Sequence, residues 1–182
     1  MTKALLLIDI QNDYFPGGAM ELVNSSLAAV KAGKLLQVFR QEALPIIHIQ
    51  HVSVRPGATF FLPDTVGVEI HESVAPADGE TVFQKYYPNS FRATPLLEHL
   101  RDCRISELVI AGMMTHMCVD STTRAATDLG FQPILAHDAC ATRALSFGGA
   151  TVSAEDVQRA FIAALNGLFA KVLSVEEICA SL

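Results

Sequence analysis

Three residue types that can cooperate in nucleophilic catalysis follow apolar stretches typical of buried strands: a carboxylate, an ammonium and a thiol. They are Asp9, Lys85 and Cys118. A carboxylate beside a thiol can take up the thiol proton as a general base, and the thiolate is the nucleophilic form of cysteine. An adjacent ammonium opposes the negative charge of that thiolate. The combination predicts a cysteine nucleophile supported by a base and a cation.

Cys118 is the best candidate nucleophile of the four cysteines. The pattern places it in the first turn of a helix that begins just after a strand, and a helix N-terminus can lower the pKa of a thiol. Cys103, Cys140 and Cys179 are scattered, with no CxxC pair and no zinc-ligand spacing, so we interpret them as structural thiols. The sequence therefore predicts that the pKa of Cys118 lies below its ordinary value.

Strands and helices alternate along the chain. The continuous apolar runs predict strands at Lys3–Ile10, Ile46–His51, Thr81–Gln84, Glu107–Gly112, Pro133–His137 and Val172–Leu173. Helices are predicted from a cap at Asn24, Ser25 or Ser26, over Leu96–Cys103, over His116–Leu129, from a cap at Ser153, and over Val175–Ala180. This order predicts an α/β fold with one three-layer α/β/α domain over residues 1–182 and a mainly parallel sheet. Ligands of such sheets bind beyond the carboxyl ends of the strands.

Residues 52–80 form a long segment rich in proline and glycine, which we expect to cover a site or build an interface. Aromatic residues on this and two neighbouring loops are candidates for an apolar substrate pocket. The candidate substrate contacts are Tyr14, Phe15, Phe60, Phe61, Tyr87, Phe91 and, two residues before the thiol, His116.

Charge and hydropathy exclude several function classes. The 182 residues include 13 Lys and Arg against 19 Asp and Glu, for a net charge of −6, so nucleic acid and anionic membrane are not expected partners. No run approaches a membrane span, and the start of the chain is too short in apolar residues for a signal peptide. The sequence predicts a cytoplasmic protein that acts on a small molecule.

The residues around the three chemical groups resemble the isochorismatase-like cysteine hydrolases. The matching stretches are LLLIDIQNDYF at 5–15, FQKYYPNSF at 83–91, VIAGMMTHMCVDSTTRAATDLG at 109–130 and HDAC at 137–140. The resemblance implies the Rossmann-like isochorismatase fold and a catalytic triad of Asp9, Lys85 and Cys118. The presence of the cysteine places the chain with the amidase branch rather than with the isochorismatases proper.

The resemblance also implies a cis peptide bond between Met113 and Met114. The N–H groups of Met114 and Cys118 would then form an oxyanion hole for the tetrahedral intermediate. The implied reaction is hydrolysis of a small non-peptide amide, carbamoyl or ureido bond through an acyl-thioester on Cys118.

Nicotinamidases of this family bind a divalent ion through an Asp-x-His motif and a further histidine. At the corresponding position this chain has His51 in place of the aspartate and Ser53 in place of the histidine. We therefore predict no metal and no other cofactor, and nicotinamide is not the expected substrate.

Three alternatives remain open at this stage. The same triad could hydrolyse an ester or a lactam, since either forms an acyl-thioester. The chain could instead be a catalytically silent domain that binds ligands as an oligomer, or a thiol-based redox sensor, although it lacks a resolving cysteine near Cys118. The family commonly assembles, so we expect a homodimer or a homotetramer.

Overall fold

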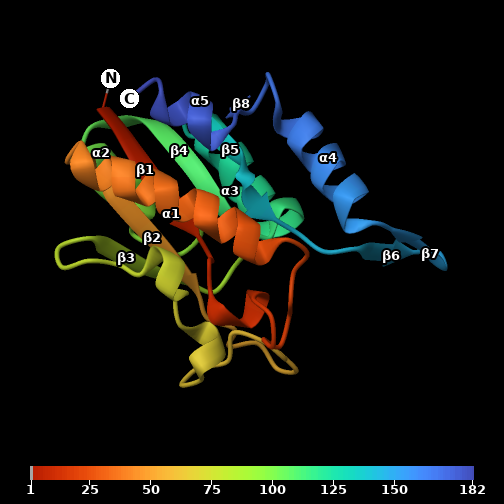
Figure 1. The fold of residues 1–182 in the computed structure, drawn as a ribbon. Helices are drawn as coiled ribbons and strands as arrows, with labels where there is room; N and C mark the ends of the chain where they lie inside the picture. The colour runs from red at the N-terminus through yellow and green to blue at the C-terminus, as the bar shows by residue number, and fades with distance from the viewer. Residues whose placement is uncertain (1) are drawn as a thin grey trace.

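The computed structural model describes residues 2–182 as a sheet with helices on both faces (Figure 1). The sheet strands are β1 (Thr2–Ile8), β2 (Ile46–His51), β3 (Thr81–Lys85), β4 (Ile105–Met113), β5 (Gln132–Ala141) and β8 (Lys171–Leu173). Their order is β3-β2-β1-β4-β5-β8, and every neighbouring pair is parallel. This arrangement confirms the predicted α/β fold with a mainly parallel sheet. Strands this apolar are typical of parallel sheets whose two faces are both covered.

Five α-helices cover the two faces of the sheet. They are α1 (Ser25–Gln41), α2 (Leu96–Asp102), α3 (Asp120–Asp128), α4 (Ala154–Leu165) and α5 (Val175–Cys179). Alternate residues of β1 divide between two cores, with Leu5 and Leu7 packed against α1 and α5, and Leu6 and Ile8 packed against α2, α3 and α4. This alternation is the period-2 pattern of a strand buried on both sides.

The long segment between β2 and β3 contains two short 3-10 helices, η2 (Val66–Val68) and η3 (Glu72–Val74). It lies beside the loop after β1, which contains the 3-10 helix η1 (Asn12–Tyr14), and a bridge between Gln11 and Ile70 joins them (Figure 1). These two segments therefore form the walls around the carboxyl ends of β1 and β2.

One element was not predicted. Strands β6 (Leu145–Phe147) and β7 (Ala150–Val152) form an antiparallel hairpin that projects away from the sheet (Figure 1). Its residues are largely exposed, Phe147 at its tip is 92% exposed, and each strand has only three residues, so the alternation of LSF and ATV is too short to predict a strand.

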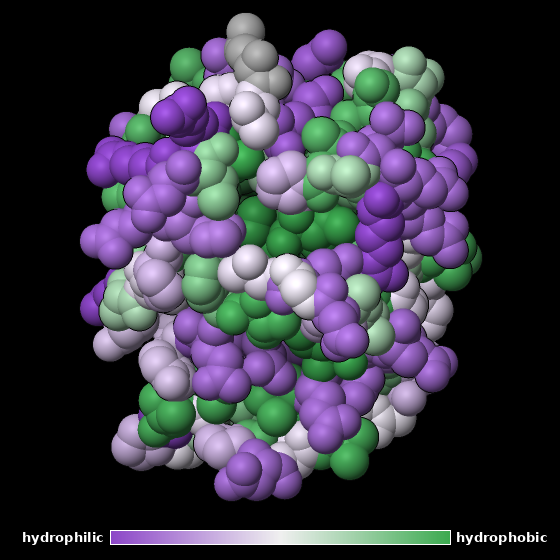
Figure 2. Space-filling model, turned by 90° about the vertical axis from the view of Figure 1, so that its left-hand side faces the viewer, coloured by the Kyte–Doolittle hydropathy of each residue, from purple (hydrophilic) through white to green (hydrophobic). Residues whose placement is uncertain are grey.

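The surface beside the β3 edge is mostly polar, and apolar residues show mainly in the hollows between polar ones (Figure 2). Among residues 2–182, no helix has both the length and the apolar character that crossing a bilayer requires.

Candidate active site

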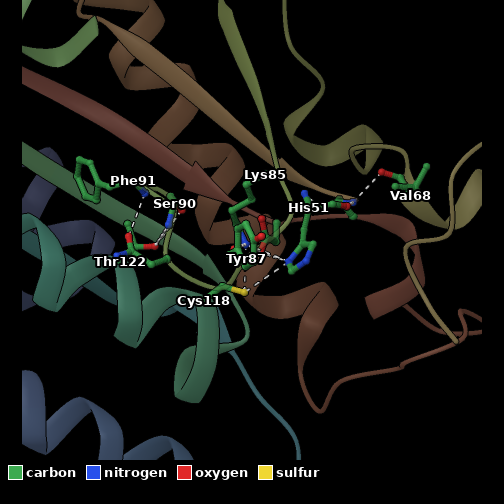
Figure 3. Close-up of polar contacts among 11 residues, drawn as sticks. His51, Val68, Lys85, Tyr87, Ser90, Phe91, Cys118 and Thr122 are labelled. Atoms are coloured by element: carbon green, nitrogen blue, oxygen red, sulfur yellow. Dashed lines mark hydrogen bonds and ion pairs between the residues drawn. The ribbon is translucent and has the colours of Figure 1, made fainter. Parts of the chain in front are cut away.

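Asp9, Lys85 and Cys118 lie together at the carboxyl end of the sheet. Figure 3 shows Lys85 beside Cys118. The Lys85 Nζ atom is 2.7 Å from Asp9 Oδ2 and 3.2 Å from Cys118 Sγ. Each of the three residues is at most 1% exposed. The structure thus joins, at contact distance, three residues separated by 76 and 33 positions in the chain.

The backbone at the end of β1 directs the carboxylate into this cluster. Asp9 has φ 53°, in the left-handed region that costs free energy for a residue with a side chain, and its N–H donates to Ile49 O at 3.0 Å. On the other side, Gly112 of β4 lies so close that a Cβ atom there would overlap the Ile8 carbonyl oxygen. Close strand contact at Gly112 therefore brings the ends of β1 and β4, and the groups that follow them, together.

Cys118 lies in a single π-helical turn, Thr115–Val119, that precedes α3. The peptide bond between Met113 and Met114 is cis. The Met114 N–H donates to no acceptor within residues 2–182. The thiol is thus presented by an irregular turn between β4 and α3 rather than by the first turn of α3 itself.

A fourth residue, His51, belongs to the same cluster. Its Nδ1 atom lies 3.0 Å from Lys85 Nζ, 3.8 Å from Cys118 Sγ and 3.7 Å from Asp9 Oδ2 (Figure 3). The sequence analysis did not include it in the catalytic site. The missed signal is the sheet register, because His51 and Lys85 are direct partners on the adjacent parallel strands β2 and β3.

Opposite charges stabilise the ionised forms of the cluster. Burial opposes the charged form of Lys85, but the Asp9 carboxylate and the Cys118 sulfur hold its pKa above the ordinary value. Burial likewise acts to raise the pKa of Asp9, but the Lys85 ammonium holds that pKa below the ordinary value. The ion pair therefore stays ionised at neutral pH.

The predicted direction of the Cys118 shift is wrong. Burial, and then the neighbouring Asp9 carboxylate, raise the pKa of Cys118 well above its ordinary value, and Lys85 opposes this only in part. The sequence shows the helix and the cation but not the depth of burial. Cys118 is accordingly a thiol in the resting protein, and it needs a base to become a nucleophile.

The residues of the cluster do not fit a metal ion. Asp9, His51 and Cys118 are the one set of His, Cys, Asp or Glu among residues 2–182 with ligand atoms close enough, all within 4.8 Å of one another. The Lys85 ammonium, however, is within 3.2 Å of each of them and occupies the position that a cation would need. With the pKa of Lys85 raised, this site already contains its positive charge.

A cavity of about 350 Å³ opens beside the thiol. Three of the predicted substrate contacts, Tyr14, Phe60 and Tyr87, line it together with Cys118. The other lining residues, which the sequence analysis did not select as substrate contacts, are His51, Ser53, Val54, Arg55, Tyr86, Pro88 and Met117. The walls are mainly aromatic and aliphatic, as in pockets for small organic molecules.

Two predicted contacts on the loops nearest Asp9 do not line this cavity. Phe15 is buried and stacks on His71, with ring centroids 3.6 Å apart. Phe61 is fully buried behind the wall, with its ring 4.6 Å from that of Tyr14. Phe61 therefore supports the wall of the pocket from the core side, because its ring also packs against that of Phe60.

Two further predicted contacts also lie outside the cavity. Phe91 stacks on Phe131, with centroids 6.0 Å apart in the core beneath α2 and α3. The His116 Nδ1 atom is 2.6 Å from Thr142 Oγ1, so this histidine pairs with the end of β5. Sequence position identified the correct loops, but it could not show the direction of each side chain.

Known proteins are similar to this chain in sequence and in fold. The model of the Isochorismatase domain family matches residues 3–177. The isochorismatase family protein YddQ of Bacillus subtilis is 51% identical over 97% of this chain and 98% of its own length. Streptothricin hydrolase of Streptomyces noursei is 34% identical over 77% of this chain, which matches 54% of that protein. A crystal structure of a protein described as an isochorismatase hydrolase from Oleispira antarctica has 50% identity and a TM-score of 0.95, over 98% of this chain and 96% of that one.

Proposed function

Because the chain belongs to the isochorismatase family, we propose that it is a cysteine hydrolase of a small non-peptide C–N bond in an amide, carbamoyl or ureido group. The observation that carries this proposal is the placement of Lys85 between the Asp9 carboxylate and the Cys118 thiol, at the edge of a cavity of small-molecule size. The name of streptothricin hydrolase supports hydrolysis as the reaction type.

In the first half of the reaction, Asp9 accepts the Cys118 proton and the sulfur attacks the substrate carbonyl carbon. The negative oxygen of the tetrahedral intermediate would be stabilised by the N–H groups of Met114 and Cys118. The C–N bond then breaks, the leaving nitrogen takes the proton from Asp9, and an acyl-thioester remains on the sulfur.

In the second half, Asp9 takes a proton from water as the water oxygen attacks the thioester carbonyl. The C–S bond breaks, the acid leaves, and the proton returns to the sulfur. Lys85 stays charged throughout and stabilises both the carboxylate and the thiolate, each of which is negative in part of the cycle. The products are one carboxylic acid and one amine or ammonia for each water consumed.

A cytoplasmic, homo-oligomeric enzyme remains part of this proposal. Exposed apolar side chains support self-association, because Phe147 on the hairpin and Leu168 after α4 are 92% and 76% exposed.

The test is release of ammonia or amine from a panel of primary amides and ureido compounds by the purified protein. Acid-quenched samples should contain a Cys118 peptide with the added mass of the acyl group. The matched controls are Cys118→Ala, which should lose both signals, and Cys103→Ala, which replaces an exposed cysteine and should keep them. Hydrolysis that survives in Cys118→Ala would overturn the thioester mechanism.

A further inference from the structure

Neighbouring residues hold both the backbone and the ring of His51 in place. The Gln11 side chain accepts from His51 N–H at 2.7 Å and donates to His51 O at 2.9 Å, and its donor also reaches Val68 O at 2.7 Å. In register on the adjacent strand, Lys85 holds the edge of the ring that contains Nδ1. The loop after β1 and the loop after β2 therefore both determine where this imidazole lies.

The contact with Lys85 determines which ring nitrogen carries the proton. An ammonium has three N–H donors and no lone pair, so every group that hydrogen-bonds to it must accept. The Lys85 ammonium lies 3.0 Å from His51 Nδ1 and 3.1 Å from Tyr87 O, in addition to its contacts with the carboxylate and the thiol. Three N–H groups cannot serve all four neighbours at once, but a proton on His51 Nδ1 would face the ammonium at 3.0 Å, donor against donor. The geometry therefore favours Nδ1 as an acceptor, with the ring proton on Nε2.

The other edge of the ring is available to a ligand. His51 lines the cavity, its side chain is 15% exposed, and Nε2 has no hydrogen-bond partner within residues 2–182. The cavity wall around it is largely apolar, with Phe60, Tyr86 and Met117 among its residues. An N–H group in such surroundings has few protein acceptors near it. A ligand that supplies an acceptor would therefore give this N–H the hydrogen bond that it lacks.

We propose that His51 contacts the substrate directly, with its Nε2–H donating a hydrogen bond to an acceptor atom on the acyl side of the scissile carbonyl. The inference rests on the proposed function and narrows its substrate class. The nearest edge of the ring is 3.8 Å from the Cys118 sulfur, so the ring flanks any acyl group that the sulfur attacks. Amides with an oxygen on the carbon next to the carbonyl, such as oxamic or 2-oxo amides, are therefore favoured over alkyl amides of the same size.

The first test reads the tautomer without any substrate. Nitrogen-15 NMR of histidine-labelled protein at pH 8 distinguishes a proton on Nε2 from one on Nδ1, and His51→Gln assigns the signal among the six histidines. We expect the Nε2–H form. An Nδ1–H form or a doubly protonated ring would overturn the proposal.

The second test uses three primary amides of matched size: oxamate, its neutral analogue pyruvamide, and isobutyramide, which replaces the acceptor oxygens by methyl groups. Titrated into labelled Cys118→Ala, the first two should shift the His51 Nε2 signal and isobutyramide should not. A shift that is absent for all three, or equal for all three, would contradict the proposal.

The kinetic test separates a substrate contact from a structural support. One lost hydrogen bond typically costs a few-fold to about tenfold, so His51→Leu should raise KM for pyruvamide by about that factor and leave KM for isobutyramide unchanged. His51→Gln, which keeps an N–H donor, should recover part of the loss. Equal losses in kcat for both amides would mean that His51 only supports Lys85. If the binding shifts occur but no amide is hydrolysed, the proposed hydrolase fails while the His51 contact stands.

Discussion

The protein contains two clusters of the same composition, each with a carboxylate, a long cationic side chain and a histidine. The site cluster is Asp9, Lys85 and His51, and the edge cluster is Glu80, Arg40 and His48. Strand β3 connects them, because Glu80 directly precedes it and Lys85 ends it. Only the site cluster adjoins a cysteine and the cavity described above.

In the edge cluster both oxygens of the carboxylate are hydrogen-bonded. Glu80 accepts from Arg40 Nε at 2.6 Å and Nη2 at 2.9 Å, from His48 Nε2 at 2.8 Å and from the Ala77 N–H at 2.9 Å. These donors, Arg40 first, lower the pKa of Glu80 to about 2. Both oxygens of this carboxylate are hydrogen-bonded, so taking up a proton would weaken its bonds to the charged Arg40, and its role is to join α1 to β2 and β3.

In the site cluster the carboxylate is left partly free. Asp9 Oδ2 forms the ion pair with Lys85, but Oδ1 is buried and has no hydrogen-bond partner within residues 2–182. Leaving a buried acceptor unpaired costs free energy. The two clusters thus differ in one carboxylate oxygen without a hydrogen bond, and we infer that this free acceptor beside a thiol, rather than charge composition, suits the site cluster to the proposed proton transfer.

The largest expected effect is on activity. Asp9→Asn keeps the shape of the side chain but cannot accept the thiol proton, so kcat/KM should fall by about 10²–10⁴. Glu80→Gln, the matched change in the edge cluster, should leave kcat/KM within about twofold, since it lies outside the cavity. Both values are measured on any amide that the wild-type protein hydrolyses. More than a tenth of wild-type activity in Asp9→Asn would exclude it as the general base.

The fold was largely predictable because its elements carry strong local patterns. Runs such as Ala4–Ile8 and Leu108–Ala111 are buried on both faces, so they appear in the sequence as uninterrupted apolar stretches. The hairpin β6–β7 was missed because its side chains pack against little, although Gly148 and Gly149 at its turn have positive φ and are typical hairpin residues.

The site was predictable only in part, for a physical reason. Strand ends locate Asp9 and Lys85 because parallel strands present their carboxyl ends at one edge. The local sequence does not encode how deeply a side chain is buried or in which direction it points. The raised pKa of Cys118 and the burial of the Phe61 ring therefore became visible only in the structure. His51 needed the register between β2 and β3, which a single strand does not reveal.

A smaller effect is expected on the stability of the fold, from a substitution in the edge cluster. Glu80→Gln should lower the free energy of unfolding at pH 7 by about 1–3 kcal/mol, because hydrogen bonds to a charged group are lost. The pKa of Glu80 is lower in the folded protein than its ordinary value of 4.5. Its contribution is therefore complete above pH 4.5 and is lost as the pH falls toward about 2.

Urea unfolding of wild type and Glu80→Gln at several pH values measures this contribution. The difference in unfolding free energy should be constant from pH 7 to 5 and shrink below pH 4. A difference that grows on acidification would show that the carboxylate is not ionised in the fold.

The smallest expected effect concerns the Cys118 thiol itself. The Asp9 carboxylate raises the pKa of Cys118, whereas Lys85 lowers it. Asp9→Asn removes the negative charge that raises this pKa and keeps the Lys85 charge that lowers it. The thiolate fraction at pH 8 should therefore rise, about tenfold for each unit by which the pKa falls. Cys118 lines the cavity, so a small reagent is the suitable probe. Alkylation of Cys118 by iodoacetamide should therefore be faster in this inactive variant than in the wild type. Peptide mapping measures the rate, exposed Cys103 serves as the internal standard, and Glu80→Gln should leave the Cys118 rate unchanged. Slower alkylation in Asp9→Asn would mean that Asp9 acts on the resting thiol as a base that promotes its reaction, rather than as a charge that suppresses the thiolate.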